Sequence, residues 1–217
     1  MEGIIILIVT IAAFLAMGTW ALIKALKGPD LPKGHKFVHK FAGNKAIVVM
    51  DKNLSSFKDP NTKKVAGVII GGVKYMGSEV AEKCAVAIQA TEQAFKQKDI
   101  KKADVDKVVF HFQADDEFED GSEWWQQFSK NIAAYSKQYS AIFGAKPRYR
   151  ATIRSKYLKS VSERGQPAVH ELVHILNNDA GEGYNHDHSD PDLWNGHGSD
   201  TVEAIGVRNW SDLVKNL

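Results

Sequence analysis

A long uncharged apolar segment near the start of the chain restricts the fold more than any other feature. Residues 3–23 read GIIILIVTIAAFLAMGTWALI and contain no Asp, Glu, Lys or Arg. A helix rises about 1.5 Å per residue, so about twenty such residues span the roughly 30 Å apolar core of a bilayer. A cleaved secretory signal is the alternative, but it needs basic residues ahead of the apolar stretch, and only Met1 and Glu2 stand there. We therefore predict a transmembrane anchor over residues 1–26.

The lysines that follow this segment indicate its orientation. Basic residues beside a membrane span stay on the cytoplasmic side, so we expect a single-pass protein whose C-terminal domain is cytoplasmic. The lysines concerned are Lys24, Lys27, Lys33, Lys36 and Lys40. Residues 27–43 include KGPDLPKGH, whose two prolines and two glycines are typical of a linker. We expect the folded domain to cover residues 44–217.

The composition restricts the class of protein. The chain has 217 residues, of which 44% are hydrophobic and 25% are charged, as in one globular domain. The net charge is only +2 and the lysines are scattered, so the sequence shows no basic stripe for nucleic acid. The single cysteine, Cys84, excludes an internal disulfide and is expected to be a small buried residue.

The pattern of apolar residues predicts a mixed fold. Runs of β-branched residues predict strands at 45–51, 65–73, 107–112 and 148–158, and the first two could pair as a hairpin. The last of these alternates apolar and charged residues, as a half-exposed strand does. Helical spacing predicts a long helix from Ser78, capped by that serine, and a second helix over residues 125–144. We predict an α+β fold with one sheet, with α/β as the alternative.

A third helix is predicted where the chain reads QPAVHELVHILNND, residues 166–179. Pro167 suits the first turn of a helix, because proline lacks an N–H that would be unpaired there in any case. Asparagine tolerates the left-handed conformation that ends a helix, so we expect this one to stop at Asn177 or Asn178. An apolar stripe would bury the helix against the core, and it consists of Val169, Leu172, Val173 and Leu176.

Two histidines on this helix stand one turn apart. His170 and His174 can bind one zinc ion (Zn²⁺) at about 2.0 to 2.1 Å each, on a face beside the apolar stripe. Glu171 follows the first histidine and can reach a water molecule on the metal. The alternative is a core helix whose histidines and acid are satisfied by hydrogen bonds. Burying these groups without a metal or partner costs several kcal/mol, which favours the metal site.

A downstream cluster, HDHSDPDLW, offers a third ligand. His186, His188 and Asp190 are spaced by two, so they share one face of an extended segment. We prefer His188, because a nitrogen donor suits zinc and the longer connection from His174 lets this residue return to the helix more easily. His186 is the close second, and Asp190 can either bind or orient a ligand imidazole. Tyr184 and His186 are among the available donors to a transition-state oxyanion.

The HELVH motif with a later histidine resembles the zincin superfamily of metallopeptidases. The ligand spacing is most similar to SprT-like proteases and to small HExxH proteins of bacteria and phages. It departs from the metzincin pattern at Asn177 and Ala180, where glycine and histidine would stand. A gluzincin would take its third ligand from a following helix, and Glu203 is the available residue.

The resemblance implies a zincin-like mixed sheet with a long backing helix, which the helix from Ser78 would supply, and an active-site helix. It also implies that an extended peptide substrate pairs with the edge of a strand, for which we expect the strand around Arg150–Arg154.

These features predict a membrane-anchored, zinc-dependent metallopeptidase acting on a protein or peptide. Zinc would lower the pKa of its bound water toward about 7, and Glu171 would take the proton as general base. The alternative is a non-catalytic, zinc-stabilised module tethered to the membrane that binds a protein partner, or a structural protein with a degenerate zincin fold. A purely structural site has four protein ligands and needs no base, so Glu171 favours the enzyme. Trp194 and Trp210 are expected to pack in the core.

Overall fold

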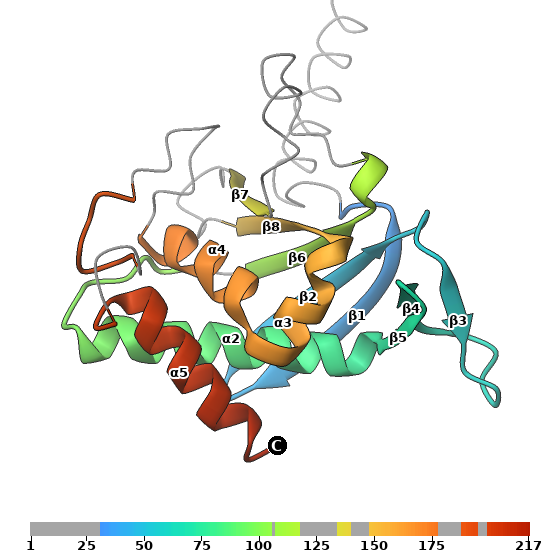
Figure 1. The fold of residues 1–217 in the computed structure, drawn as a ribbon, viewed down its shortest axis with the longest axis horizontal. Helices are drawn as coiled ribbons and strands as arrows, with labels where there is room; N and C mark the ends of the chain where they lie inside the picture. Colours follow the sequence, from blue (N-terminus) through green and yellow to red (C-terminus); the bar gives the residue numbers. More distant parts are fainter. Residues whose placement is uncertain (1–30, 106, 118–133, 140–147, 178–187, 195–198) are drawn as a thin grey trace, which may run out of the picture.

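The computed structural model describes residues 31–105, 107–117, 134–139, 148–177, 188–194 and 199–217 (Figure 1). This part of the chain contains two β-sheets and four α-helices, so the predicted α+β class is confirmed, whereas the prediction of one sheet is wrong. The predicted anchor, residues 1–26, lies outside the described residues. Within them, no helix has both the length and the hydropathy needed to cross a bilayer.

The main sheet has five strands in the order β1-β2-β6-β8-β7. The central strands β2, β6 and β8 are parallel, whereas β1 and β7 run antiparallel to their neighbours at the two sides. The sheet is therefore mixed, as predicted. Its strands are β1 (Gly34–Phe41), β2 (Asn44–Asp51), β6 (Lys107–Gln113), β7 (Ala134–Tyr139) and β8 (Arg148–Arg154).

A separate three-stranded sheet is formed by β3 (Ser56–Lys58), β4 (Val65–Ile70) and β5 (Val73–Met76). Gly71 and Gly72 turn the chain between β4 and β5 with φ angles of 56° and 81°. The predicted hairpin of residues 45–51 with 65–73 is wrong, because β2 pairs with β1 and β6. Both runs are β-branched and apolar, which predicts strands but does not specify their partners.

Strand β1 lies within the segment expected to be linker, so the boundary at Asn44 is wrong. Its residues alternate strictly between exposed and half-buried positions, and Phe37 and Phe41 pack against the core. This alternation is typical of a strand with one solvent-facing side. The prolines that suggested a linker, at 29 and 32, precede the strand.

The four helices lie on one side of the main sheet (Figure 1). Helix α2 (Gly77–Gln97) contacts β1 and β2 on one side and α4 and α5 on the other. Its predicted stripe is buried, including Cys84, and burial raises the pKa of that thiol. The predicted cap is wrong: the helix begins at Gly77, one residue before Ser78. Its N-cap residue, Met76, makes no side-chain capping bond.

The remaining helices are α3 (Leu158–Arg164), α4 (Gln166–Asn177) and α5 (Val202–Val214), with short 3-10 turns at Asp115–Glu117 and Ser155–Tyr157.

The helix predicted over residues 125–144 is wrong where the structure describes it. Residues 134–139 form β7, and the rest of that range lies outside the described residues. Tyr135 and Tyr139 are four residues apart in the sequence, a spacing that fits one face of a helix and also one face of a strand. The segment forms a strand because it pairs with β8.

Strand β8 is more buried than the sequence predicts. Tyr149, Ala151 and Ile153 face the core, but Thr152 and Arg154 on the other side are buried too, so the strand is not half-exposed. It is hydrogen-bonded to β6 on one side and β7 on the other. The strand around Arg150–Arg154 is therefore not an edge, and the expectation that substrate pairs with it is wrong.

Candidate metal centre

Helix α4 begins at Gln166 and ends at Asn177, as the sequence predicts. Its apolar stripe is fully buried, and it packs against α2, β7 and β8. A sharp turn at Gly165, with φ of 68°, ends α3 and starts α4. A side chain at that position would lie 2.5 Å from the Trp210 ring, so glycine is required there by conformation and by space.

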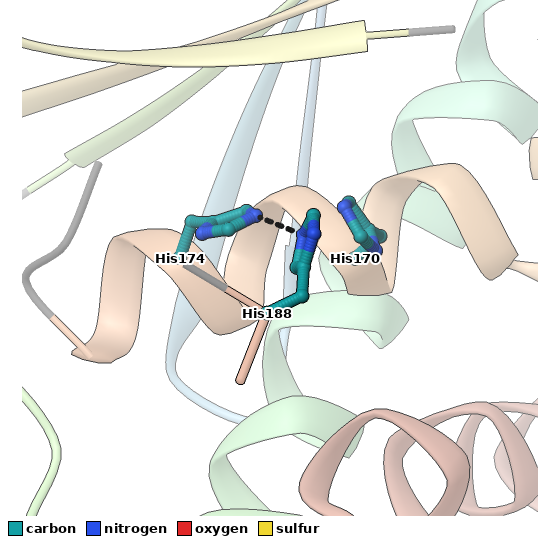
Figure 2. Close-up of side chains that lie close together, drawn as sticks. All are labelled: His170, His174 and His188. Carbon is teal, nitrogen blue, oxygen red and sulfur yellow. Dashed lines mark hydrogen bonds between the residues drawn. The ribbon is translucent and has the colours of Figure 1, made fainter. Parts of the chain in front are cut away.

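The three preferred histidines come together. One ligand atom from each of His170, His174 and His188 lies within 4.8 Å of the other two. Figure 2 shows the three rings facing a common point, two from α4 and one from the segment after it. The Nε2 atoms of His174 and His188 are 3.2 Å apart. Two ligands at about 2.0 to 2.1 Å from one tetrahedral ion would be separated by roughly 3.3 Å, so this pair already has the spacing that a metal requires.

Glu203 orients the first histidine. Its Oε1 lies 2.9 Å from Nδ1 of His170, and its side chain is buried. With the proton on Nδ1, His170 donates this hydrogen bond and leaves Nε2 for a metal. Glu203 is thus the hydrogen-bond partner of a candidate ligand, and it is outside the group of three histidines that could hold a metal.

Glu171 follows His170 on α4 and lies inside the protein. Its side chain is only 2% exposed, although it carries a carboxylate. Burial of a carboxylate is costly unless a hydrogen-bond donor, a cation or a metal compensates it. The position next to His170 on α4 suits a proton acceptor at a metal site.

Asp190 shapes the segment that carries the third histidine. Its Oδ1 accepts the backbone N–H of Asp192 at 2.9 Å, and its backbone oxygen accepts those of Leu193 and Trp194. These bonds fold residues 190–194 into a compact turn. Asp190 does not belong to the group of three histidines. The other predicted candidates, Tyr184 and His186, lie outside the described residues.

Residues 190–194 are bonded to residues at the ends of two helices. The backbone N–H of Val202 bonds to Asp192 O at 2.8 Å, and that of Glu203 bonds to Leu193 O at 3.0 Å. Lys98, just after α2, reaches Asp192 with Nζ 2.9 Å from Oδ1. The hydrogen bond to Asp192 raises the pKa of Lys98. The segment after His188 is therefore held between the C-terminal end of α2 and the N-terminal end of α5.

Trp194 contacts all three histidines, which the sequence did not indicate. The indole centroid lies 4.2 Å from the His174 ring, 4.5 Å from His188 and 5.1 Å from His170. Trp194 is 2% exposed and belongs to the core, as predicted, but it also borders the site. Trp210 is a core residue as expected, and its Nε1 donates to Lys83 O.

The three histidines differ in their exposure to solvent. His174 is buried, His170 is half-buried and His188 is exposed, so the group opens to solvent on the side of His188. Among the described residues, no fourth His, Cys, Asp or Glu joins it. Three protein ligands with an open side are typical of catalytic rather than structural zinc sites.

No protein-family model, curated protein or solved structure matches this chain. The likeness to zincins therefore rests on the HELVH motif and on the three histidines alone.

Proposed function

We propose that this chain is a zinc-dependent metallopeptidase, anchored to a membrane by residues 1–26 and acting on a protein or peptide in the cytoplasm. The observation that carries the proposal is the convergence of His170, His174 and His188, two of them on the helix that also carries the buried Glu171. A non-catalytic metal module would need the three histidines but not an acid in that position.

The donor set suits zinc. Imidazole nitrogen is a preferred zinc ligand, and three of them with one open position make the usual catalytic set. The separation of 3.2 Å between two of the nitrogens and the carboxylate behind His170 both agree with this use. His170, His174 and His188 would hold the ion.

Each remaining residue then has a chemical role. Zinc, when bound, lowers the pKa of water at the site toward about 7 and polarises the substrate carbonyl. Glu171 takes the proton from the attacking water and passes it to the leaving amine. Glu203 holds His170 in the correct tautomer and orientation throughout.

Strand β7 is the best place for the substrate, and it replaces the expectation for β8. Among the described strands, β7 is the outermost on the side of the sheet that α4 contacts. Figure 1 shows α4 beside β7 and β8. In the zincin-like arrangement that we propose, α2 is the backing helix and α4 the active-site helix. An extended peptide that adds to the edge of β7 would lie along a strand that α4, the helix of His170 and His174, contacts.

The test uses the full-length chain purified in detergent. Zinc content and peptide hydrolysis are measured in parallel for wild type, Glu171→Gln and His188→Ala. We expect one zinc per wild-type chain, retained zinc with hydrolysis reduced about 10²- to 10⁴-fold in Glu171→Gln, and loss of both in His188→Ala. Glu163→Gln is the control, because this acid on α3 is exposed.

The possible outcomes separate the candidate functions. Wild type without stoichiometric zinc would contradict the metal site itself. Stoichiometric zinc with no hydrolysis of any peptide in a mixed library would favour the membrane-tethered binding module. For the anchor, resistance to alkaline extraction from membranes and protection assays with added protease give the topology, and an extractable chain would contradict the proposal.

A further inference from the structure

We infer that Trp194 is a positioning residue of the metal centre, and that its indole ring holds the three imidazoles in their binding arrangement before a metal arrives. The inference rests on the metal site of the proposed function but not on peptide hydrolysis. It goes beyond the core role that the sequence indicates for this tryptophan.

The arrangement of the four rings is the first argument. The three imidazole centroids form a nearly equilateral triangle, with sides of 5.1, 5.1 and 5.2 Å. The indole centroid is 4.2 to 5.1 Å from each corner, so it must lie on one side of the triangle's plane. One rigid side chain thus restricts the rotation of all three ligands.

The individual contacts differ in a way that suits this role. The indole is tilted by 37° to the His174 ring at 4.2 Å, close to stacking. It meets the His188 ring at 81°, edge to face, at 4.5 Å. Aromatic rings attract one another in both offset-stacked and edge-to-face arrangements. His188 gains most from the contact, because it is exposed and stands on a segment outside the helices.

The indole is buried, and the backbone that carries it is hydrogen-bonded. Trp194 is 2% exposed, and its backbone N–H bonds to Asp190 O. The preceding residue, Leu193, accepts the N–H of Glu203 through its backbone oxygen at 3.0 Å. A side chain fixed in this manner loses little freedom when the metal binds, so it lowers the entropic cost of assembling the ligands.

The test compares substitutions of Trp194 with the same substitutions of Trp210. Both tryptophans are 2% exposed and belong to the same core, but Trp210 bonds to Lys83 O and makes no contact with the histidines in the described residues. Trp194→Leu keeps an apolar side chain but removes the flat ring and part of the packing, whereas Trp194→Phe keeps an aromatic face. Trp210→Leu reproduces the loss of packing alone.

The measurements use full-length protein in detergent with Zn²⁺ or Co²⁺ alone. Dissociation constants come from competition with a chelator, the visible spectrum of bound Co²⁺ reports ligand geometry, and circular dichroism verifies the fold of each metal-free variant. We expect Trp194→Leu to weaken metal binding about 10- to 100-fold and to alter the cobalt spectrum, as loss of a ligand-orienting partner does. Trp194→Phe should recover most of the affinity, and Trp210→Leu should lower thermal stability while the affinity of the folded protein stays within about twofold.

The outcomes distinguish this inference from the proposed function. Wild type that binds neither metal would overturn both. Wild type that binds metal, together with folded Trp194→Leu of unchanged affinity and unchanged cobalt spectrum, would overturn the positioning role alone. Equal losses in the Leu variants of Trp194 and Trp210 would also overturn it, since packing would then explain the effect.

Discussion

The hydrogen bond between Glu203 and His170 gives the sharpest quantitative prediction for the site. Glu203 is buried, and its Oε1 lies 2.9 Å from the ring nitrogen that a metal would not use. Replacement by leucine removes the acceptor and leaves the imidazole free to rotate or change tautomer. Replacement by glutamine keeps an oxygen acceptor of similar size but removes the negative charge.

The expected loss of zinc affinity follows from the type of hydrogen bond that is removed. A hydrogen bond to a charged group contributes about 1.5 to 3 kcal/mol, and loss of a carboxylate behind a metal-bound histidine typically costs 10- to 100-fold in affinity. That range corresponds to about 1.4 to 2.8 kcal/mol, so the two estimates agree. We expect Glu203→Leu to weaken zinc binding by this amount. A charge-assisted bond is about twice as strong as a neutral one, so Glu203→Gln should cost roughly 3- to 10-fold.

The assay must separate metal affinity from helix stability. Glu203 stands in the first turn of α5, where a negative charge stabilises the helix by about 0.3 to 1 kcal/mol. Zinc dissociation constants are therefore measured by chelator competition, and the unfolding of metal-free protein is measured separately. Asp212→Asn is the matched control, because it removes a charge from the same helix at an exposed position paired with Lys215.

A particular result would refute this reasoning. If folded Glu203→Leu bound zinc within about twofold of wild type, the carboxylate would not orient His170. If Glu203→Gln lost as much affinity as Glu203→Leu, the charge rather than the acceptor would carry the effect.

Two further predictions concern stability. Gly165→Ala should lower the free energy of unfolding by about 2 to 4 kcal/mol in urea titration, because its positive φ strains alanine and its Cβ would lie 2.5 Å from Trp210. Gly71→Ala, with positive φ but nothing within 4 Å, should cost only about 1 kcal/mol, and equal costs would contradict the steric argument. Burial, and secondarily Arg150, lower the pKa of His111 to about 4. The unfolded chain, with pKa about 6.5, then binds more protons, so stability is complete above pH 6.5 and falls by up to about 3 kcal/mol toward pH 4. Urea titrations at a series of pH values should show a shallower acid loss in His111→Gln, and an unchanged slope would contradict the assignment.

The local parts of the site were predictable from the sequence. Proline near the start, asparagine at the end and an apolar stripe between them predict α4, which ends at Asn177, one of the two predicted positions. The spacing of four then placed His170 and His174 on one face. The choice of His188 rested on donor type and chain length, and its convergence with the other two agrees with that choice.

The errors arose where pairing between distant residues decides the structure. Strand β1 was hidden by the prolines before it, and β7 was read as helix because its tyrosines fit both periods. The resemblance to zincins implied that β8 is an edge, and alternation along one strand does not show whether a neighbour lies beyond it. Each of these depends on contacts that no short window of sequence contains.

The roles of Glu203 and Trp194 beside the histidines depend on one backbone connection, which explains why the sequence could not assign them. Glu203 is 33 residues from His170, yet it reaches that ring because the start of α5 is bonded to residues 192 and 193. In the sequence, His188 precedes these two bonded residues and Trp194 follows them directly. Hydrogen bonds between residues 192–193 and 202–203 therefore bring the segment of His188 and Trp194 together with Glu203.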